Sequence, residues 1–255
     1  MTEMNYYNDY YEKLHVKERK LNEWEKKRIE DTLSILPSDA NSLLEVGCGD
    51  GRILNQLVGK YKNICGLDIS YNALNYVKTK TIQGSLENLP FPDNSFDVVM
   101  CCEVLEHLPY SIYEKAIKEI ERVAKKYILI SVPNNENLDI EMVKCPQCSC
   151  SFHTWRHLRT FDKEKLTFLF KNFIIYKTKI VLMDQFIFGN LIINLKKRLN
   201  ILNQEFPNSS LCPQCGYSPE YKISHNEENF RSRWVNLFSL KKGVWIIALY
   251  KCSTS

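Results

Sequence analysis

Short apolar runs alternate with amphipathic segments through the first half of this sequence. Four runs have the length and the Val, Ile and Leu content of buried strands: 42–47, 62–67, 96–102 and 125–132. The segments between them have helical spacing, at 51–59, 71–79 and 111–124. This alternation predicts an α/β fold, with a parallel sheet and helices on both of its faces. Right-handed crossovers then bring the carboxyl ends of the strands to one edge, where ligands bind.

The flanking regions follow a different pattern. Leu and Ile recur on one side of a charged stretch at 9–36, which predicts one amphipathic helix ended by Pro37. After residue 133 the alternation stops, and only a helix near 162–171, a strand near 173–182 and a last strand at 243–252 are predicted. We therefore divide the chain as follows: helical cap 1–38, core 39–133, first insertion 134–160, core helix and strand 161–183, second insertion 184–240, final strand and tail 241–255.

Composition restricts the class of protein. A chain of 255 residues with 44% hydrophobic and 25% charged residues is long enough for one large globular domain with insertions. A formal charge of +4 is too small to indicate nucleic-acid binding by itself. No apolar run reaches the roughly 18 residues of a membrane span, and the first residues do not resemble a signal peptide. These features predict a cytoplasmic protein.

A glycine-rich turn follows the first predicted strand, in the stretch LLEVGCGDGRIL. Gly47, Gly49 and Gly51 alternate there, although the whole chain has only 9 glycines. Such a turn lets a ligand approach the backbone, and a helix start offers free N–H groups. Asp68 ends the next predicted strand at the offset from Gly47 that suits hydrogen bonds from a ribose. Spacing alone does not separate a nicotinamide cofactor from another adenosine-bearing one.

Three ordered motifs settle that choice by resemblance: LLEVGCGDGRIL, GLDIS and GSLENLPFPDNSFDVVMCCEVLEHLP. Residues 40–133 resemble the class I S-adenosylmethionine-dependent methyltransferases, and most of all the branch with the quinone-biosynthesis and small-molecule enzymes. The resemblance implies a doubly wound, mostly parallel, seven-stranded Rossmann-like sheet. It also implies S-adenosylmethionine as cofactor and in-line methyl transfer to O, N or C of a small-molecule acceptor.

The resemblance also implies roles for particular residues. The implied cofactor-binding residues are Glu45, Gly47, Gly49, Asp68, Ile69, Ser85, Leu86 and Cys102. Ser85 stands where relatives often carry Asp, and a hydroxyl holds the adenine amine less firmly than a carboxylate. An N-terminal helix in the resembled family often covers the cofactor, so Tyr10 and Tyr11 are candidate contacts; packing of that helix on the sheet is the alternative.

His107, in the stretch EVLEHLP, is the candidate general base, because imidazole titrates near neutral pH. The alternative is a histidine that only caps local backbone. For Glu103 and Glu106 we expect a solvated or loop-bracing role. His153, Arg156 and His157 follow Cys148 on the edge where a predicted strand ends, so they are further candidates for the acceptor pocket. A core or supporting role is the alternative for the two histidines, and which histidine is the base stays open.

The tetrapeptide CPQC occurs twice, as Cys145–Cys148 and Cys212–Cys215. Two such pairs predict one closed, structural zinc site with four thiolates. Cys150, His153 and His157 are alternative local ligands, and four surface cysteines without metal are the remaining interpretation.

Two other functions compete with a small-molecule methyltransferase. Zinc knuckles often serve nucleic acid, which favours an RNA methyltransferase, but basic and acidic residues alternate in the N-terminal segment. The second alternative is a catalytically silent scaffold that binds the cofactor. The sequence predicts a small-molecule acceptor, does not favour nucleic acid, and carries no signal for the oligomeric state.

Overall fold

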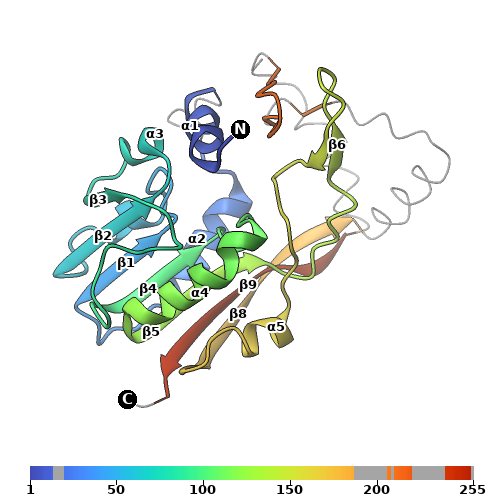
Figure 1. Cartoon of the computed structure of the whole chain (residues 1–255). Coiled ribbons are helices and arrows are strands. Elements are labelled where there is room, and N and C mark those ends of the chain that lie inside the picture. Colours follow the sequence, from blue (N-terminus) through green and yellow to red (C-terminus); the bar gives the residue numbers. More distant parts are fainter. Residues whose placement is uncertain (14–19, 187–205, 208–209, 220–238, 254–255) are drawn as a thin grey trace.

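The computed structural model describes residues 1–13, 20–186, 206–207, 210–219 and 239–253. A seven-stranded sheet runs through the molecule in the order β3-β2-β1-β4-β5-β9-β8 (Figure 1). Its strands are β1 Ser42–Val46, β2 Asn63–Asp68, β3 Lys80–Gln83, β4 Phe96–Cys102, β5 Ala124–Pro133, β8 Phe173–Phe186 and β9 Ser239–Cys252. Strands β1 to β5 are mutually parallel, whereas β9 is antiparallel to both β5 and β8. The predicted doubly wound, mostly parallel sheet is therefore confirmed.

Alternate residues of the central strands fill two hydrophobic cores. Along β4, Val99 and Cys101 belong to one core while Val98 and Met100 belong to the other. Helix α4 (Tyr110–Val123) packs into the first core, and helix α2 (Glu23–Ile35) packs into the second. Because both faces are buried, the central strands consist mostly of apolar residues instead of alternating apolar and polar ones.

The predicted single helix at 9–36 is wrong. The structure has two helices there, α1 (Glu3–Lys13) and α2, and residues 20–22 between them are not helical. Asn22 begins α2 with a capping box, in which its side chain accepts from the N–H of Glu25 at 2.8 Å and Glu25 accepts from the N–H of Asn22 at 3.0 Å. This reciprocal pair satisfies two free N–H groups and starts a new helix.

Two predicted helices are much shorter than their patterns. The segment 51–59 forms only a 3₁₀ turn at Leu54–Leu57, because Gly51 and Gly59 on either side have positive φ angles of 77° and 81°. The segment 71–79 is helical only in α3 (Tyr71–Leu74). The chain then extends into β3, an edge strand that the sequence analysis missed.

The insertions gather beyond the sheet edge where β4 and β5 end. The first contains a small antiparallel pair, β6 (Met142–Lys144) and β7 (Ser151–His153), and α5 (Lys163–Thr167) returns the chain to the core. Residues 210–219 carry the second CPQC and lie on the connection between β8 and β9. Most of the predicted second insertion, 184–240, lies outside the described residues. Among the described helices, none has the length and apolarity to cross a membrane.

Candidate cofactor and acceptor site

A cavity of about 950 Å³ opens at the carboxyl ends of β1, β2 and β4. Its lining includes residues of the three motifs described above: Gly47, Asp68, Ile69, Ser85, Leu86 and His107. Helix α1 forms another wall with Tyr6, Tyr7, Tyr10 and Tyr11. The remaining wall comes from Glu136, Arg156, His157 and Trp245, which lie after β5, in the first insertion and on β9. The cavity therefore joins the predicted cofactor region to the predicted acceptor region.

The glycine loop adopts a conformation that other residues rarely adopt. Gly47, Gly49 and Gly51 have φ angles of 70°, 53° and 77°. A Cβ at Gly47 would also collide with Val104, and one at Gly49 would collide with the hydroxyl of Tyr11. The loop is thus kept free of side chains both by its backbone angles and by the close approach of α1 and the segment after β4.

Asp68 is held by the same loop. Its Oδ2 accepts from the N–H of Gly49 and its Oδ1 from the N–H of Ser70, both at 2.8 Å. Burial raises the pKa of this carboxyl despite these N–H donors. Asp68 lines the cavity with 8% of its surface exposed, so its carboxylate is fixed in orientation and still accessible.

Glu45 lies behind the loop and does not line the cavity. It accepts from the backbone N–H of Leu54, while its Oε2 is buried without a hydrogen-bond partner. Burial raises its pKa to about 8, and the nearby guanidinium of Arg28 opposes that shift. Glu45 therefore supports the turn after the glycine loop, although the resemblance implies a cofactor-binding residue.

Glu103 braces the end of β4, as expected. It adopts a positive φ of 57°, and its carboxylate accepts from Ser131 Oγ at 3.0 Å and from Trp245 Nε1 at 2.7 Å. Arg28 of α2 lies 3.6 Å from the same carboxylate. These contacts connect α2, β5 and β9 at the mouth of the cavity.

The predicted base, His107, lines the cavity next to a second histidine. Its ring centroid lies 4.8 Å from that of His157, which in turn stacks on His153 at 4.8 Å. Burial is the main cause of a pKa for His107 well below the ordinary value, and the neighbouring histidine lowers it further. Glu106 beside it is fully buried, and burial raises its pKa well above the ordinary value. Burial therefore favours the uncharged form of both groups.

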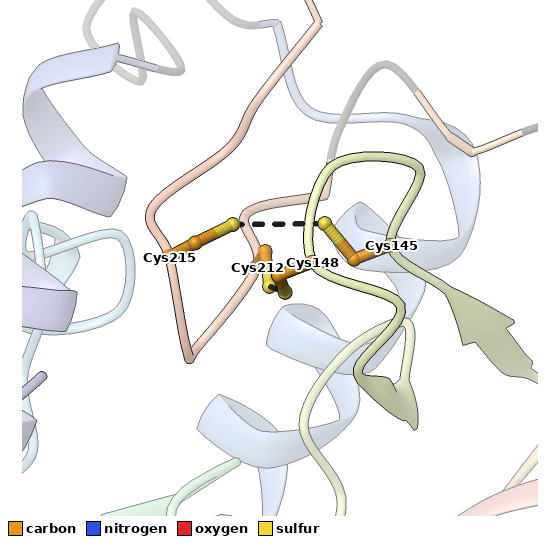
Figure 2. A group of neighbouring side chains, drawn as sticks. All are labelled: Cys145, Cys148, Cys212 and Cys215. Carbon is orange, nitrogen blue, oxygen red and sulfur yellow. Dashed lines mark hydrogen bonds between the residues drawn. The ribbon is translucent and has the colours of Figure 1, made fainter.

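The four CPQC cysteines converge from the two insertions (Figure 2). The Sγ atoms of Cys145 and Cys215 are 3.7 Å apart and those of Cys148 and Cys212 are 3.6 Å apart, and all four lie within 4.8 Å of one another. A tetrahedral zinc with Zn–S bonds near 2.3 Å requires S–S separations of about 3.8 Å. The cluster has the size of a zinc site.

The two knuckles have the same backbone geometry. In each, the residue after the second cysteine donates to the carbonyl of the first, Ser149 to Cys145 at 3.0 Å and Gly216 to Cys212 at 2.9 Å. Both donors have positive φ, 61° at Ser149 and 71° at Gly216. Backbone N–H groups also point at the first sulfur of each pair. The two knuckles therefore share one backbone conformation, although this position is Ser in the first and Gly in the second.

The cysteine cluster contacts helix α1. Tyr6 donates its hydroxyl to the carbonyl of Leu211 at 3.4 Å, and Lys13 Nζ reaches the carbonyl of Gly216 at 3.3 Å. Arg156 binds both carboxylate oxygens of Glu3, at 2.7 and 3.3 Å, and lies 4.1 Å from the centroid of the Tyr6 ring. The insertions thus hold the helix that covers the glycine loop.

The structure brings most of the predicted site residues together around one cavity. Of the predicted cofactor and acceptor residues, Glu45, Gly49, Cys102 and His153 do not line it, and the four CPQC cysteines form their separate cluster. Cys102 is buried behind the lining residue Glu103, and Cys150 is not in the cysteine cluster. Arg28 and Glu136 were not predicted from the sequence, because neither lies in a recognisable motif. They come close to the site only in the tertiary fold.

Comparison with known proteins agrees with this geometry over part of the chain. Residues 44–129 match the family model of a methyltransferase domain. An uncharacterized protein of Methanocaldococcus jannaschii is 40% identical over 100 residues, 38% of this chain and 42% of that protein. A demethylmenaquinone methyltransferase of Staphylococcus epidermidis is 36% identical over 111 residues, 39% of this chain and 44% of the enzyme. The match thus spans less than half the length of either relative.

The fold similarity extends further than the sequence similarity. The crystal structure of an S-adenosylmethionine-dependent methyltransferase from Archaeoglobus fulgidus aligns with a TM-score of 0.51 at 16% identity, covering 89% of this chain and 92% of that one. At this identity the likeness concerns the fold alone. The chain therefore has the Rossmann-like methyltransferase fold, and its residues 44–129 match a methyltransferase domain.

Proposed function

We propose that this protein is a methyltransferase that transfers a methyl group from S-adenosylmethionine to a small-molecule acceptor. The observation that carries the proposal is the single cavity, which begins at Gly47 and Asp68 and continues to His107 and His157. A methyl donor and an acceptor must share one space for in-line transfer. The cavity offers that space and has a mixed apolar and polar wall, as small-molecule sites do.

In this proposal the matched residues bind the donor. Asp68 accepts hydrogen bonds from the ribose hydroxyls, and Ile69 and Leu86 pack against the adenine. Ser85 lies beside them with a hydroxyl for the adenine edge. The α1 tyrosines exclude water from this end of the cavity. Bound S-adenosylmethionine supplies a methyl group on a sulfonium that carries its own leaving group, so the chain has to position and desolvate the reactants.

The test is transfer of labelled methyl from S-adenosylmethionine into an extract of the native cell, followed by nuclease treatment and size fractionation. Label in nuclease-resistant small molecules supports the proposal and gives the fraction from which to purify the acceptor. Label that appears in small fragments only after nuclease treatment favours the RNA alternative. Binding of the donor without transfer to any fraction favours a cofactor-binding scaffold. Asp68→Ala serves as the negative control in each case.

We also propose that Cys145, Cys148, Cys212 and Cys215 bind one structural zinc ion. The support is the separation of their sulfurs and the matching knuckle geometry. Four thiolates leave no open coordination position, which favours a structural over a catalytic metal. Metal analysis of protein purified without chelator should find one zinc per chain, and Cys148→Ser should lose it. Full metal content in that variant would contradict this ligand set.

A further inference from the structure

Three histidines and two glutamates cluster at the acceptor end of the cavity. The cluster consists of His107, His153, His157, Glu106 and Glu136, and it forms two overlapping triads that share His157. Methyl transfer to a protic acceptor needs one base, and three imidazoles are present. Their hydrogen bonds distinguish which nitrogen is free to accept a proton.

The tautomer of His153 follows from a backbone contact. The N–H of His157 donates to His153 Nδ1 at 3.2 Å, so that nitrogen carries a lone pair. Burial lowers the pKa of His153 to about 4, which makes this imidazole neutral at pH 7. Its proton must then be on Nε2. That atom is buried and lies 3.7 Å from Glu136 Oε1, so His153 presents an N–H toward the carboxylate.

Glu136 in turn determines the tautomer of His157. Its Oε2 lies 2.5 Å from His157 Nδ1, and a carboxylate in this position accepts a proton from the ring nitrogen. His157 therefore carries its proton on Nδ1, and Nε2 retains a lone pair. The imidazole is 11% exposed and lines the cavity.

Ring packing fixes the orientation of His157. His153 stacks on one face with an interplanar angle of 20°, and the His107 ring packs edge-on at 71°. With these two rings packed against it, His157 cannot rotate without opening the cluster. The carboxylate partner and the packed rings together give the arrangement that orients a general base in enzymes.

His107 is less suited to this task. Its Nδ1 is buried without a partner, and its ring is hydrogen-bonded to the backbone of Arg156. Neither nitrogen is then available to a group in the cavity. Burial and the neighbouring histidine also lower its pKa well below the ordinary value.

We propose that His157 is the general base of methyl transfer and that Glu136 and His153 are its positioning residues. This inference rests on the proposed function and assigns the chemistry to residues outside the matched domain. The acceptor proton passes to His157 Nε2 while the acceptor lone pair forms a bond to the methyl carbon. The carbon–sulfur bond breaks with its electron pair going to sulfur, which leaves a neutral thioether. The imidazolium that forms is stabilised by the Glu136 carboxylate.

The basicity of an imidazole restricts how weakly acidic the acceptor hydroxyl can be. A neutral imidazole matches a hydroxyl of phenolic or enolic acidity much better than an aliphatic alcohol. Charged and titratable groups that face His157 also include Glu141, which lines the same cavity, and Arg156, the preceding residue. Glu106 is fully buried, and burial raises its pKa well above the ordinary value, which favours its uncharged form. The negative charge nearest to the His157 ring is that of Glu136.

The first test needs no acceptor. In protein labelled with ¹⁵N-histidine and saturated with S-adenosylhomocysteine, long-range ¹H–¹⁵N spectra report which ring nitrogen is protonated, and the variants H153Q and H157Q assign the signals. We expect the Nδ1–H tautomer at His157 and the Nε2–H tautomer at His153, with the His157 preference lost in Glu136→Gln. An Nε2–H tautomer at His157 in the wild-type protein would overturn the assignment.

The second test uses the purified acceptor fraction and labelled S-adenosylmethionine. His157→Gln should lower kcat by about 10² to 10⁴, and Glu136→Gln should lower it by a smaller factor. The isosteric neighbour variant Glu141→Gln should lose less than Glu136→Gln. A greater kcat loss in His107→Gln than in His157→Gln would refute the assignment. So would a second bound metal equivalent that disappears in His157→Gln, because the cluster would then be a metal centre.

Calorimetry separates this inference from the proposed function. All these variants should bind S-adenosylmethionine with an affinity within about twofold of the wild type, since none of the substituted residues belongs to the proposed donor end. Absence of donor binding in the wild-type protein would refute the proposed function itself. Donor binding and transfer with full kcat in His157→Gln would refute only the base.

Discussion

Disrupting the contact between Glu3 and Arg156 should loosen helix α1 and weaken binding of the methyl donor. Arg156 binds Glu3 in a bidentate manner at 2.7 and 3.3 Å, and the two side chains are only 12% and 26% exposed. Hydrogen bonds to charged groups contribute about 1.5–3 kcal/mol in such positions. The guanidinium also lies 4.1 Å from the Tyr6 ring centroid, which adds about 1 kcal/mol or more.

This free energy sets an upper limit on the loss of donor affinity in the variants. If α1 must be docked for the donor to bind, losing 1.5–3 kcal/mol of docking raises the Kd by roughly 10- to 150-fold. Calorimetric titration of S-adenosylmethionine into the wild type, Glu3→Gln, Arg156→Gln and the double variant completes a thermodynamic cycle. We expect a coupling of about 1.5 kcal/mol or more between the two positions.

A matched control is the pair Glu23 and Lys26 on α2, which is 2.7 Å apart but 83% and 52% exposed. Its cycle should give no more than about 0.5 kcal/mol of stability and no change in donor affinity. A coupling between Glu3 and Arg156 below about 0.5 kcal/mol would refute the reasoning. Unchanged donor affinity in both single variants, with the fold intact, would show that α1 does not close the cavity.

Three further predictions concern single residues. Asp68→Ala should raise the Kd for the donor by more than about 100-fold without unfolding the protein, because the carboxylate is expected to accept two ribose hydroxyls; calorimetry and a thermal melt check this. Cys212→Ser should release zinc and lower the Tm, since four ligands are needed for a closed site. Glu45→Gln should remove a pH dependence of stability: the pKa of Glu45 is raised from 4.5 to about 8, so its contribution is full below pH 4.5 and is lost as the pH rises through 8, at about 1.4 kcal/mol per unit.

Each of these has its own contrary outcome. Donor affinity unchanged in Asp68→Ala would remove Asp68 from the site. Cys252→Ser, a substitution in β9, is the control for Cys212→Ser, and equal zinc contents in the two variants would contradict the four-cysteine site. For Glu45, urea unfolding of wild type and variant at pH 5 and pH 8 should give a stability difference that shifts against the wild type at the higher pH. A stability difference that does not change with pH would mean that folding does not raise the pKa of Glu45.

The sequence predicts the inner part of the fold well because its signals are local. Strands β1, β2, β4 and β5 are buried on both faces and are therefore mostly apolar. The edge strand β3, whose residues are exposed or only partly buried, has no such signature. The break between α1 and α2 was missed because both helices have the same charged composition, and among the described residues it is the capping box at Asn22 that marks the start of α2.

The site divides in the same way. Gly47 and Asp68 are predictable, because each performs its task through its own backbone or side chain at the end of a strand. Glu136 is not, since its importance depends on two histidines that the insertion folds back beside it. The pairing of the CPQC knuckles was predicted from their repetition. Their contact with α1 was not, because it depends on the path of the insertions in space.

The placement of β9 has a consequence for synthesis of the chain. Residues 245–251 of β9 form the antiparallel partner of β5 residues 127–133, and β9 also pairs along β8. While the ribosome is still making the connection before β9, β5 has one unpaired edge and the first CPQC knuckle lacks its partner cysteines. Exposed strand edges attract other chains, and long-range pairing is slow. Until β9 emerges, this edge of β5 should stay open to pairing with other chains, and the proposed zinc site cannot close before residues 212–215 are made.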